Sequence, residues 1–156
     1  MVPSLSLEEE VLRLVLAAVL GGAVGIEREL REHEAGLRTH MLVAVGSALF
    51  TLVSAYGFSE FFAAQEGNRF VPIDPTRIAA QIVTGIGFLG AGAIIRQGAN
   101  IRGLTTAATL WAVAAIGLAA GAGFYAGAVA TTIVVIIALW PVRIVTRRLL
   151  GREDEA

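Results

Sequence analysis

The chain has 156 residues, of which 56% are hydrophobic and only 16% are charged, and its formal net charge is -1. Its length suits one domain, and its composition is more apolar than that of ordinary soluble proteins. The nearly balanced charge gives no reason to expect binding to nucleic acid, and the lack of cysteine excludes disulfides and thiolate metal sites. No combination of nucleophile, base and orienting residue stands out, so we expect neither an enzyme nor a resident cofactor.

The N-terminal half predicts two membrane-spanning helices. Residues 1–10 are acidic and lack the basic start of a signal peptide, so we expect an extracytoplasmic tail there. The first span follows, with Arg13 near its outer end, where a long side chain can reach the membrane interface. The charged segment Glu27–Arg38 predicts a loop before the second span, and the polar segment Ser59–Arg77 connects the second span to the third.

The C-terminal half contains two long uncharged runs. The first lies between Arg77 and Arg96, and the polar segment Arg96–Leu104 predicts a short turn after it. The second, Gly103–Val142, would be about 60 Å long as one helix, twice the core of a bilayer, so we expect it to fold back at Gly121–Gly123. The sequence predicts an all-α membrane protein whose membrane domain covers residues 11–145, with a C-terminal tail of residues 146–156. The predicted spans are 11–26, 39–58, 78–95, 105–120 and 124–144.

The arginine distribution predicts the orientation of these spans. With the N-terminus outside, nine of the twelve basic residues fall on the inner side and three on the outer side. Cytoplasmic loops carry the excess of basic residues in membrane proteins, so we expect an outside N-terminus and a cytoplasmic C-terminal tail. Similar tetrapeptides open the second and fourth spans, at Gly36–Thr39 and Gly103–Thr106. They favour two helical hairpins related by an axis along the membrane normal, plus a fifth helix.

A glycine motif in the third span matches the dinucleotide-binding fingerprint, as Gly85-x-Gly87-x-x-Gly90. That fingerprint needs a preceding strand and an acidic residue about 20 positions later, yet no acidic residue occurs between Asp74 and Glu153. Close approach of another helix is the better interpretation, and whether the same bare face lines a pathway stays open. The expected helix-packing residues are Gly85, Gly87, Gly90 and Gly92.

Charged and polar residues at the inner ends of the spans form a candidate site. On one interpretation, the Glu27 carboxylate is an oxygen ligand for a cation or lies at the mouth of a cation path. One or two carboxylates would suffice, because Mg²⁺ keeps several of its waters. On the other interpretation, Glu27 belongs to a salt-bridge network at the membrane edge, and we expect it to pair with Arg38 or Arg102. The candidate site residues are Glu27, Arg28, Arg38, Thr39, Arg96, Asn100, Arg102 and Thr105.

The arginines of this site favour an anion rather than a cation. They lie near two helix N-termini, which attract a lipid or nucleotide phosphate. The alternative is ordinary inside-positive charge, with Thr39 capping the second span and Thr105 or Thr106 capping the fourth. Small-residue faces on several spans exceed what one bundle can bury, so we expect a homo-oligomer, most simply a two-fold dimer.

Three segments together resemble the MgtC/SapB family of bacterial membrane proteins: GIERELREHEAGLRTH (25–40), RIAAQIVTGIGFLGAGAIIRQG (77–98) and NIRGLTTAATLWAVAAIGLAAGAGFY (100–125). The resemblance covers nearly the whole chain. It implies a multi-pass protein of the inner membrane that is linked to magnesium homeostasis, by transport or as an accessory to it, with Mg²⁺ as substrate or ligand. A regulator that binds another membrane complex, without transport of its own, is the alternative.

The chain departs from the family pattern at several positions. Many members carry Asn where Thr105 stands, and many carry Asn where His40 stands. Some members continue into a soluble C-terminal domain, whereas this sequence ends at Ala156. Any function that the family owes to that domain is therefore not expected from these residues.

Overall fold

The computed structural model describes residues 5–58, 74 and 76–140, which form five α-helices, one π-helical turn and a two-stranded hairpin. The prediction of a predominantly helical chain is confirmed, and the polar segment expected to form a short turn after the third span contains a short antiparallel hairpin. The predicted tail of residues 146–156 lies outside the described residues. The elements are α1 (Leu7–Glu29), α2 (Leu37–Leu52), η1 (Val53–Gly57), α4 (Thr76–Ala93), β1 (Ile95–Gln97), β2 (Asn100–Arg102), α5 (Leu104–Gly121) and α6 (Tyr125–Leu139).

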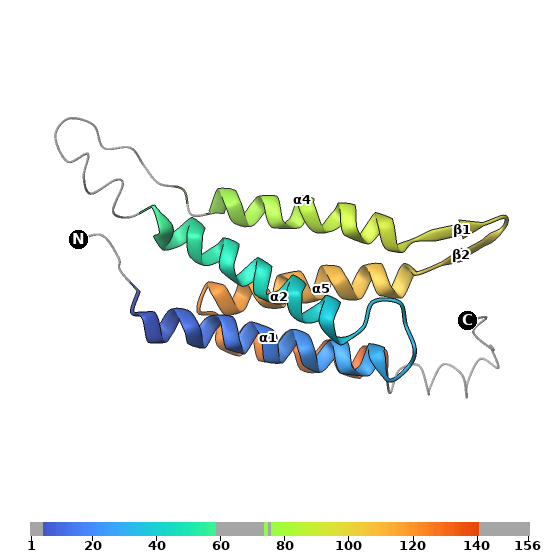
Figure 1. The fold of residues 1–156 in the computed structure, drawn as a ribbon, viewed down its shortest axis with the longest axis horizontal. Coiled ribbons are helices and arrows are strands. Elements are labelled where there is room, and N and C mark those ends of the chain that lie inside the picture. The colour runs from blue at the N-terminus through green and yellow to red at the C-terminus, as the bar shows by residue number, and fades with distance from the viewer. Residues whose placement is uncertain (1–4, 59–73, 75, 141–156) are drawn as a thin grey trace.

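The helices lie side by side in an elongated bundle (Figure 1). Helix α5 is central and contacts α1, α2, α4 and α6. The α1–α2 loop and the β1–β2 hairpin lie at one end of the bundle, which we call the loop end, and the α5–α6 turn lies at the other, the turn end (Figure 1). Helices α1 and α2 are neighbours, as are α4 and α5, but the predicted repeat symmetry between the two pairs stays a prediction.

Helix α1 begins earlier than the sequence predicted. Its N-cap is Ser6, whose hydroxyl accepts a hydrogen bond of 3.3 Å from the backbone N–H of Glu9, and the first turn is acidic. Both features stabilise the positive end of a helix. The last four residues of the expected N-terminal tail, Leu7–Glu10, are therefore helical.

Glycines allow α2 to contact α1 on one side and α5 on the other. A Cβ atom added to Gly21 of α1 would lie 2.6 Å from the Cβ of Ala44 in α2. One added to Gly117 of α5 would collide with the backbone carbonyl of the same Ala44. The buried core between these helices is correspondingly built of small and β-branched residues: Ala17, Val24, Ala44, Ala48, Val113, Ile116 and Ala120. The close approach of these helices adds dispersion contacts between them. Such contacts matter most in a membrane, where transfer of apolar side chains from lipid to protein contributes little.

The four glycines singled out in the sequence lie in α4, which is the least buried of the helices. Only Gly90 lies against another helix, with 3.7 Å from an added Cβ to the Cβ of Ala107 in α5. No atom of the described chain lies within 4 Å of a Cβ added at Gly85, Gly87 or Gly92. Their packing against a helix of another molecule stays a prediction.

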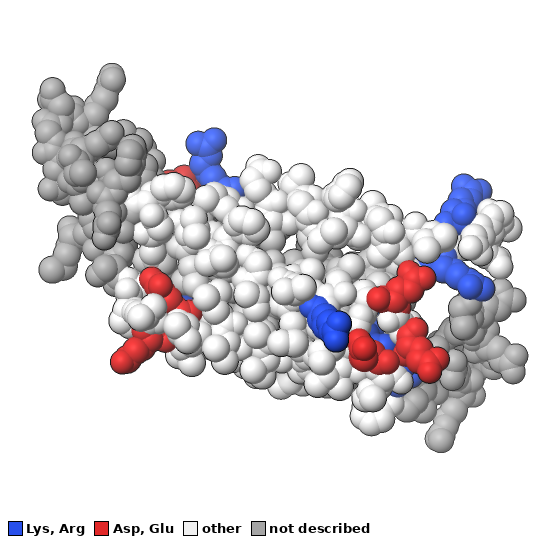
Figure 2. Space-filling model, in the orientation of Figure 1, with Lys and Arg blue, Asp and Glu red and all other residues white. Residues whose placement is uncertain are grey.

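The surface is apolar between charged ends. On the face shown in Figure 2, acidic and basic side chains gather toward the two ends and leave a broad uncharged band. Large apolar side chains such as Leu42, Phe88 and Trp111 are exposed. Among the described helical segments, Leu37–Gly57 and Leu104–Gly121 are long and apolar enough to cross a membrane, and α6 is a shorter apolar helix. That five helices cross stays a prediction.

Candidate functional site

The loop end carries a partly buried network of charges at the end of α1. The Glu27 carboxylate forms ion pairs with Arg28, at 3.6 Å, and with Arg31. Only 4% of the Arg28 side chain and 11% of the Glu27 side chain are exposed. Such pairs are expensive to break, because a charge that loses its partner in a buried site is poorly solvated. Both ion pairs lie within one segment of the chain, the last turn of α1 and the turn that follows it.

The predicted partners of Glu27 were wrong. Its ion pairs are to residues one and four positions later on the same chain segment, whereas Arg38 and Arg102 are exposed. Arg31 is reached because residues four apart share one face of a helix, and the chain still turns in that sense as α1 ends. Glu27 therefore pairs within its own segment of the chain and not with the distant arginines that we expected.

The start of α2 is also organised differently from the prediction. Its N-cap residue is Gly36, which makes no side-chain capping bond, and Thr39 is exposed in the first turn. Glu29 takes the capping role from across the loop, because its Oε2 accepts a hydrogen bond of 2.9 Å from the N–H of Leu37. A carboxylate at a helix N-terminus is favourable for the helix dipole as well. Glu29 was missed because its role depends on the fold of the loop.

The hairpin separates the two arginines that it carries. Ile95 pairs with Arg102, and Arg96 pairs with Ile101. Since successive pairs of a hairpin face opposite sides, Arg96 and Arg102 project to opposite faces. Asn100 lies on the Arg102 face, and all three residues are exposed. The expected compact arginine cluster is therefore spread over both faces of the hairpin.

The start of α5 corrects the second capping prediction. The N-cap residue is Gly103, with a positive φ of 82°, and no side chain caps the helix. A Cβ added there would collide with the carbonyl of Ala93 at the end of α4. Glycine is thus required where the hairpin returns to the bundle. Thr105 is exposed, whereas Thr106 is buried.

The turn end contains a charge network that the sequence did not reveal. The Arg13 guanidinium, expected to reach the interface, is buried instead. It bonds the Gly121 carbonyl at 2.8 Å, the Tyr125 hydroxyl at 3.2 Å and Glu9 at 3.1 Å, and it lies 5.8 Å from the ring centre of Tyr56. It therefore links α1 to η1, α5 and α6. The sequence separations of 108 and 112 residues left no local signal for it.

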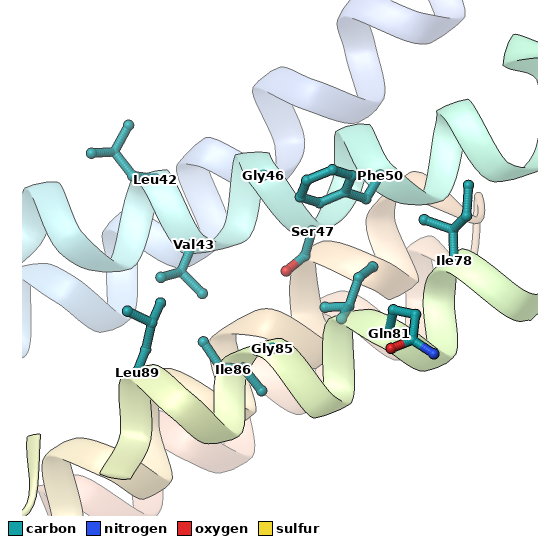
Figure 3. A pocket seen from close by; sticks show the side chains of 11 residues that line it. Leu42, Val43, Gly46, Ser47, Phe50, Ile78, Gln81, Gly85, Ile86 and Leu89 are labelled. Atoms are coloured by element: carbon teal, nitrogen blue, oxygen red, sulfur yellow. The ribbon is translucent and has the colours of Figure 1, made fainter. Parts of the chain in front are cut away.

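An apolar groove lies between α2 and α4 (Figure 3). Its volume is about 460 Å³. Figure 3 shows Phe50 and Val43 of α2 facing Ile78, Ile86 and Leu89 of α4 across it. Large apolar side chains such as Leu42 and Leu89 are exposed at the margin of this groove. The groove explains why Gly85 has open space beside it.

An elongated bundle with apolar sides and charged ends is the architecture of a helical membrane protein. The profile of the MgtC family matches residues 14–148, and the chain belongs to that family.

Individual relatives agree with this assignment. The chain is 46% identical over 145 residues to the Escherichia coli K12 protein named "Putative magnesium transporter YhiD", an alignment that covers 93% of this chain and 66% of that protein. It is 48% identical over 128 residues to Protein MgtC of Salmonella typhimurium, covering 82% of this chain and 50% of that protein. The chain thus spans between half and about two thirds of the relatives' length. No solved structure matches it.

Proposed function

We propose that this protein is a five-span protein of the bacterial inner membrane, with its N-terminus outside, that takes part in magnesium homeostasis through its loop end. The observation that carries the proposal is the Glu27 network. It consists of a carboxylate at the end of α1 that is paired with Arg28 and Arg31, and in the proposed orientation this end of the helix faces the cytoplasm. The name of the Escherichia coli relative, "Putative magnesium transporter YhiD", supports the link to magnesium.

The network offers a way for a cation to act on the fold. A Mg²⁺ ion that approaches Glu27 must compete with the two guanidinium groups, and Arg31, the more exposed of the two, is the one that can leave. Mg²⁺ retains most of its waters, so one carboxylate suffices as a direct contact. Binding of Mg²⁺ to Glu27 would then break the ion pair with Arg31 at the start of the α1–α2 loop. This effect is the same whether the protein transports Mg²⁺ or assists a transporter.

Liposome flux separates these two roles. The protein is reconstituted in liposomes that contain a Mg²⁺-sensitive dye, and the same variants are tested for growth at limiting magnesium. Flux that falls at least tenfold in Glu27→Gln, but not in the exposed control Glu34→Gln, supports transport. Growth that depends on Glu27 without any flux supports an accessory role. Normal growth of Glu27→Gln would remove the proposed functional centre.

A second candidate is recognition of phosphate groups, favoured by the exposed arginines of the loop end. Arg38, Arg96 and Arg102 all face solvent in the described chain, and in the proposed orientation they meet the anionic cytoplasmic leaflet. Native mass spectrometry of Arg96→Gln/Arg102→Gln should then show less copurified anionic lipid than wild type. The matched control is Arg77→Gln, at the opposite end of α4. Equal lipid content in all three would exclude this candidate.

The exposed face of α4 supports assembly with another membrane helix, either a second copy or a different protein. Gly85, Gly87 and Gly92 leave room for close approach, and small residues are the usual contact points of membrane helices. A two-fold dimer is the simplest such assembly. Crosslinking of Gly87→Cys subunits within membranes tests it, and crosslinks to other proteins would instead identify a partner.

A further inference from the structure

The groove between α2 and α4 carries a polar group on each of its walls. Ser47 of α2 is only 5% exposed, and Figure 3 shows its hydroxyl oxygen pointing into the groove. Gln81 lines the α4 wall. Within the described residues, neither the Ser47 hydroxyl nor the Gln81 carboxamide forms a hydrogen bond. Unpaired polar groups are unfavourable in the core of a bilayer, so the groove favours an occupant that supplies polar atoms as well as apolar surface.

The end of the groove beside Ile78 also carries two opposite charges. Arg77 immediately precedes Ile78, and it lies one turn before Gln81 on the same side of α4. The carboxylate of Asp74 accepts hydrogen bonds of 2.9 and 2.6 Å from the N–H and the hydroxyl of Thr76. Arg77 and Asp74 are both exposed, and they interact electrostatically. This end of the groove therefore matches a headgroup with one positive and one negative charge better than an anionic headgroup.

The dimensions of the groove favour a chain molecule over a helix. Its α4 wall extends from Ile78 to Leu89, which is about 16 Å at the rise of an α-helix. Division of the volume of about 460 Å³ by this length gives a mean cross-section of about 30 Å². An α-helix with its side chains is about 10 Å across, so its cross-section is more than twice as large. One extended hydrocarbon chain is thin enough, and Gly85 leaves room for it beside α4.

We infer that the groove binds one acyl chain of a zwitterionic phospholipid. Its phosphate lies at Arg77 and its ammonium at Asp74. Its ester carbonyls accept hydrogen bonds from the Gln81 carboxamide and the Ser47 hydroxyl, and the acyl chain continues past Gly85. Arg77, Gln81 and Gly85 follow one another at intervals of about 6 Å, in the order in which phosphate, ester and chain follow in the lipid. The inference rests on the membrane location of the bundle and not on a role in magnesium homeostasis.

Photolabelling in vesicles tests the inference. The full chain is reconstituted in vesicles of phosphatidylethanolamine and phosphatidylglycerol, with a trace of either lipid carrying a photoreactive group in the middle of one acyl chain. Mass spectrometry of the labelled peptides locates the adducts. We expect the zwitterionic probe to label the groove walls, near Gly46 and Ile82, about tenfold more than the anionic probe, because only its headgroup satisfies both charges. Equal labelling by the two probes over the whole apolar surface would overturn the inference.

Matched glycine variants test the position of the acyl chain. Gly85→Leu fills the groove, and we expect it to reduce labelling by the zwitterionic probe about tenfold. No described atom lies within 4 Å of a Cβ added at Gly85, so this variant should unfold at the same temperature as wild type. The control is Gly87→Leu, which meets equally open space on the other side of α4 and should be labelled like wild type. Normal labelling of Gly85→Leu would overturn the inference, and so would a loss of crosslinks between subunits with lipid labelling unchanged, since the occupant is then a second copy.

Polar variants test the headgroup contacts without filling the groove. Gln81→Leu keeps a side chain of similar size but removes its hydrogen bonds, and Arg77→Gln removes the positive charge. Each should lower labelling by the zwitterionic probe about fivefold. The control is Thr84→Val, which removes an exposed hydroxyl of α4 outside the groove and should have no effect. Labelling that stays at the wild-type level in both Gln81→Leu and Arg77→Gln would overturn the assignment of a phospholipid oriented by its headgroup.

Discussion

Arg13 and Arg28 are both buried, and each is solvated by the protein in place of water. Arg13 bonds a carboxylate, a hydroxyl and a backbone carbonyl at the turn end. Arg28 lies beside Glu27 at the loop end. A buried guanidinium requires such partners, because its transfer from water is otherwise unfavourable by several kcal/mol. The residues around these two arginines should therefore be the ones most sensitive to substitution.

The Glu27 network predicts a large loss of stability on removal of its carboxylate. Glu27→Ala should lower the free energy of unfolding by about 3 kcal/mol, because Arg28 remains buried without this ion pair. The exposed control Glu34→Ala should change it by less than about 0.5 kcal/mol. Denaturant unfolding in detergent micelles measures both. Equal stability of the two variants would place Glu27 in a solvated position.

The turn-end network predicts a dependence of stability on pH. Glu9 lies in the first turn of α1, ahead of the proposed span. A hydrogen bond from the Tyr125 hydroxyl, and then one from Arg13, lower the pKa of its carboxyl below the ordinary value of 4.5. Because the folded pKa is the lower one, the stabilisation is present above pH 4.5 and is lost as the pH falls through the folded pKa.

Thermal unfolding between neutral and acidic pH checks this dependence. Wild type should lose more stability than Glu9→Gln as the pH falls below the ordinary carboxyl range, since the variant has no carboxylate to protonate. The exposed neighbour Glu8 provides the control as Glu8→Gln, which should follow wild type. Parallel curves for wild type and Glu9→Gln would disprove the contribution of Glu9.

Sequence reasoning located charged residues better than it paired them. Glu27 and Arg28 were expected at the inner end of the first span, where the charged loop begins, and they lie in the last turn of α1, which continues to Glu29. The pairing of Glu27 with Arg31 follows helical spacing and was open to prediction. The environment of Arg13 was not, because its partners Gly121 and Tyr125 come from the far end of the sequence. Only the packed bundle brings them together.

At the level of the helices, the decisive contacts are those in which glycine faces a backbone. Gly117→Ala would place a methyl group against the Ala44 carbonyl, so the free energy of unfolding should fall by about 1–3 kcal/mol through overpacking. The matched change Gly87→Ala meets open space and should be neutral or stabilising by up to about 1 kcal/mol, because alanine favours the helix. Denaturant unfolding of monomer in detergent compares them.

A larger substitution at Gly87 separates internal packing from assembly. Replacement of Gly87 by the larger Leu should leave the monomer intact but reduce crosslinking between subunits in membranes. If Gly87→Leu lowers the free energy of unfolding of the monomer as Gly117→Ala is expected to, the outward position of Gly87 is incorrect. If it changes neither property, the α4 face contacts lipid alone.

The sequence could not show which glycines face inward. In a soluble helix, apolar residues mark the buried side, but a helix in lipid is apolar on every side. The fingerprint spacing in α4 was conspicuous, whereas Gly21 and Gly117 were scattered among eighteen glycines. The short hairpin was missed for a related reason. Its strands have three residues each, all exposed, so they are too short to show the alternation of apolar and polar residues that predicts a half-buried strand.

For the molecule as a whole, the proposed orientation places the loop end in the cytoplasm and the turn end outside. The chain has no cysteine, so single replacements can be labelled with an impermeant thiol reagent in intact cells. Ala122→Cys, exposed in the α5–α6 turn, should be labelled, and Ala99→Cys, exposed at the hairpin tip, should be labelled only after the cells are opened. The opposite pattern would invert the orientation.

The buried Arg13 also constrains the order in which the chain can mature during synthesis. When α1 first leaves the ribosome, neither the Gly121 carbonyl nor the Tyr125 hydroxyl exists, and only Glu9, one turn away, can accompany the guanidinium. An arginine in an isolated membrane helix costs about 3 kcal/mol at the centre of the bilayer and less toward its edge. In the proposed orientation, we therefore expect the first helix to lie near the outer interface until the α5–α6 turn has been made, so that the last helices of the chain complete the burial of Arg13.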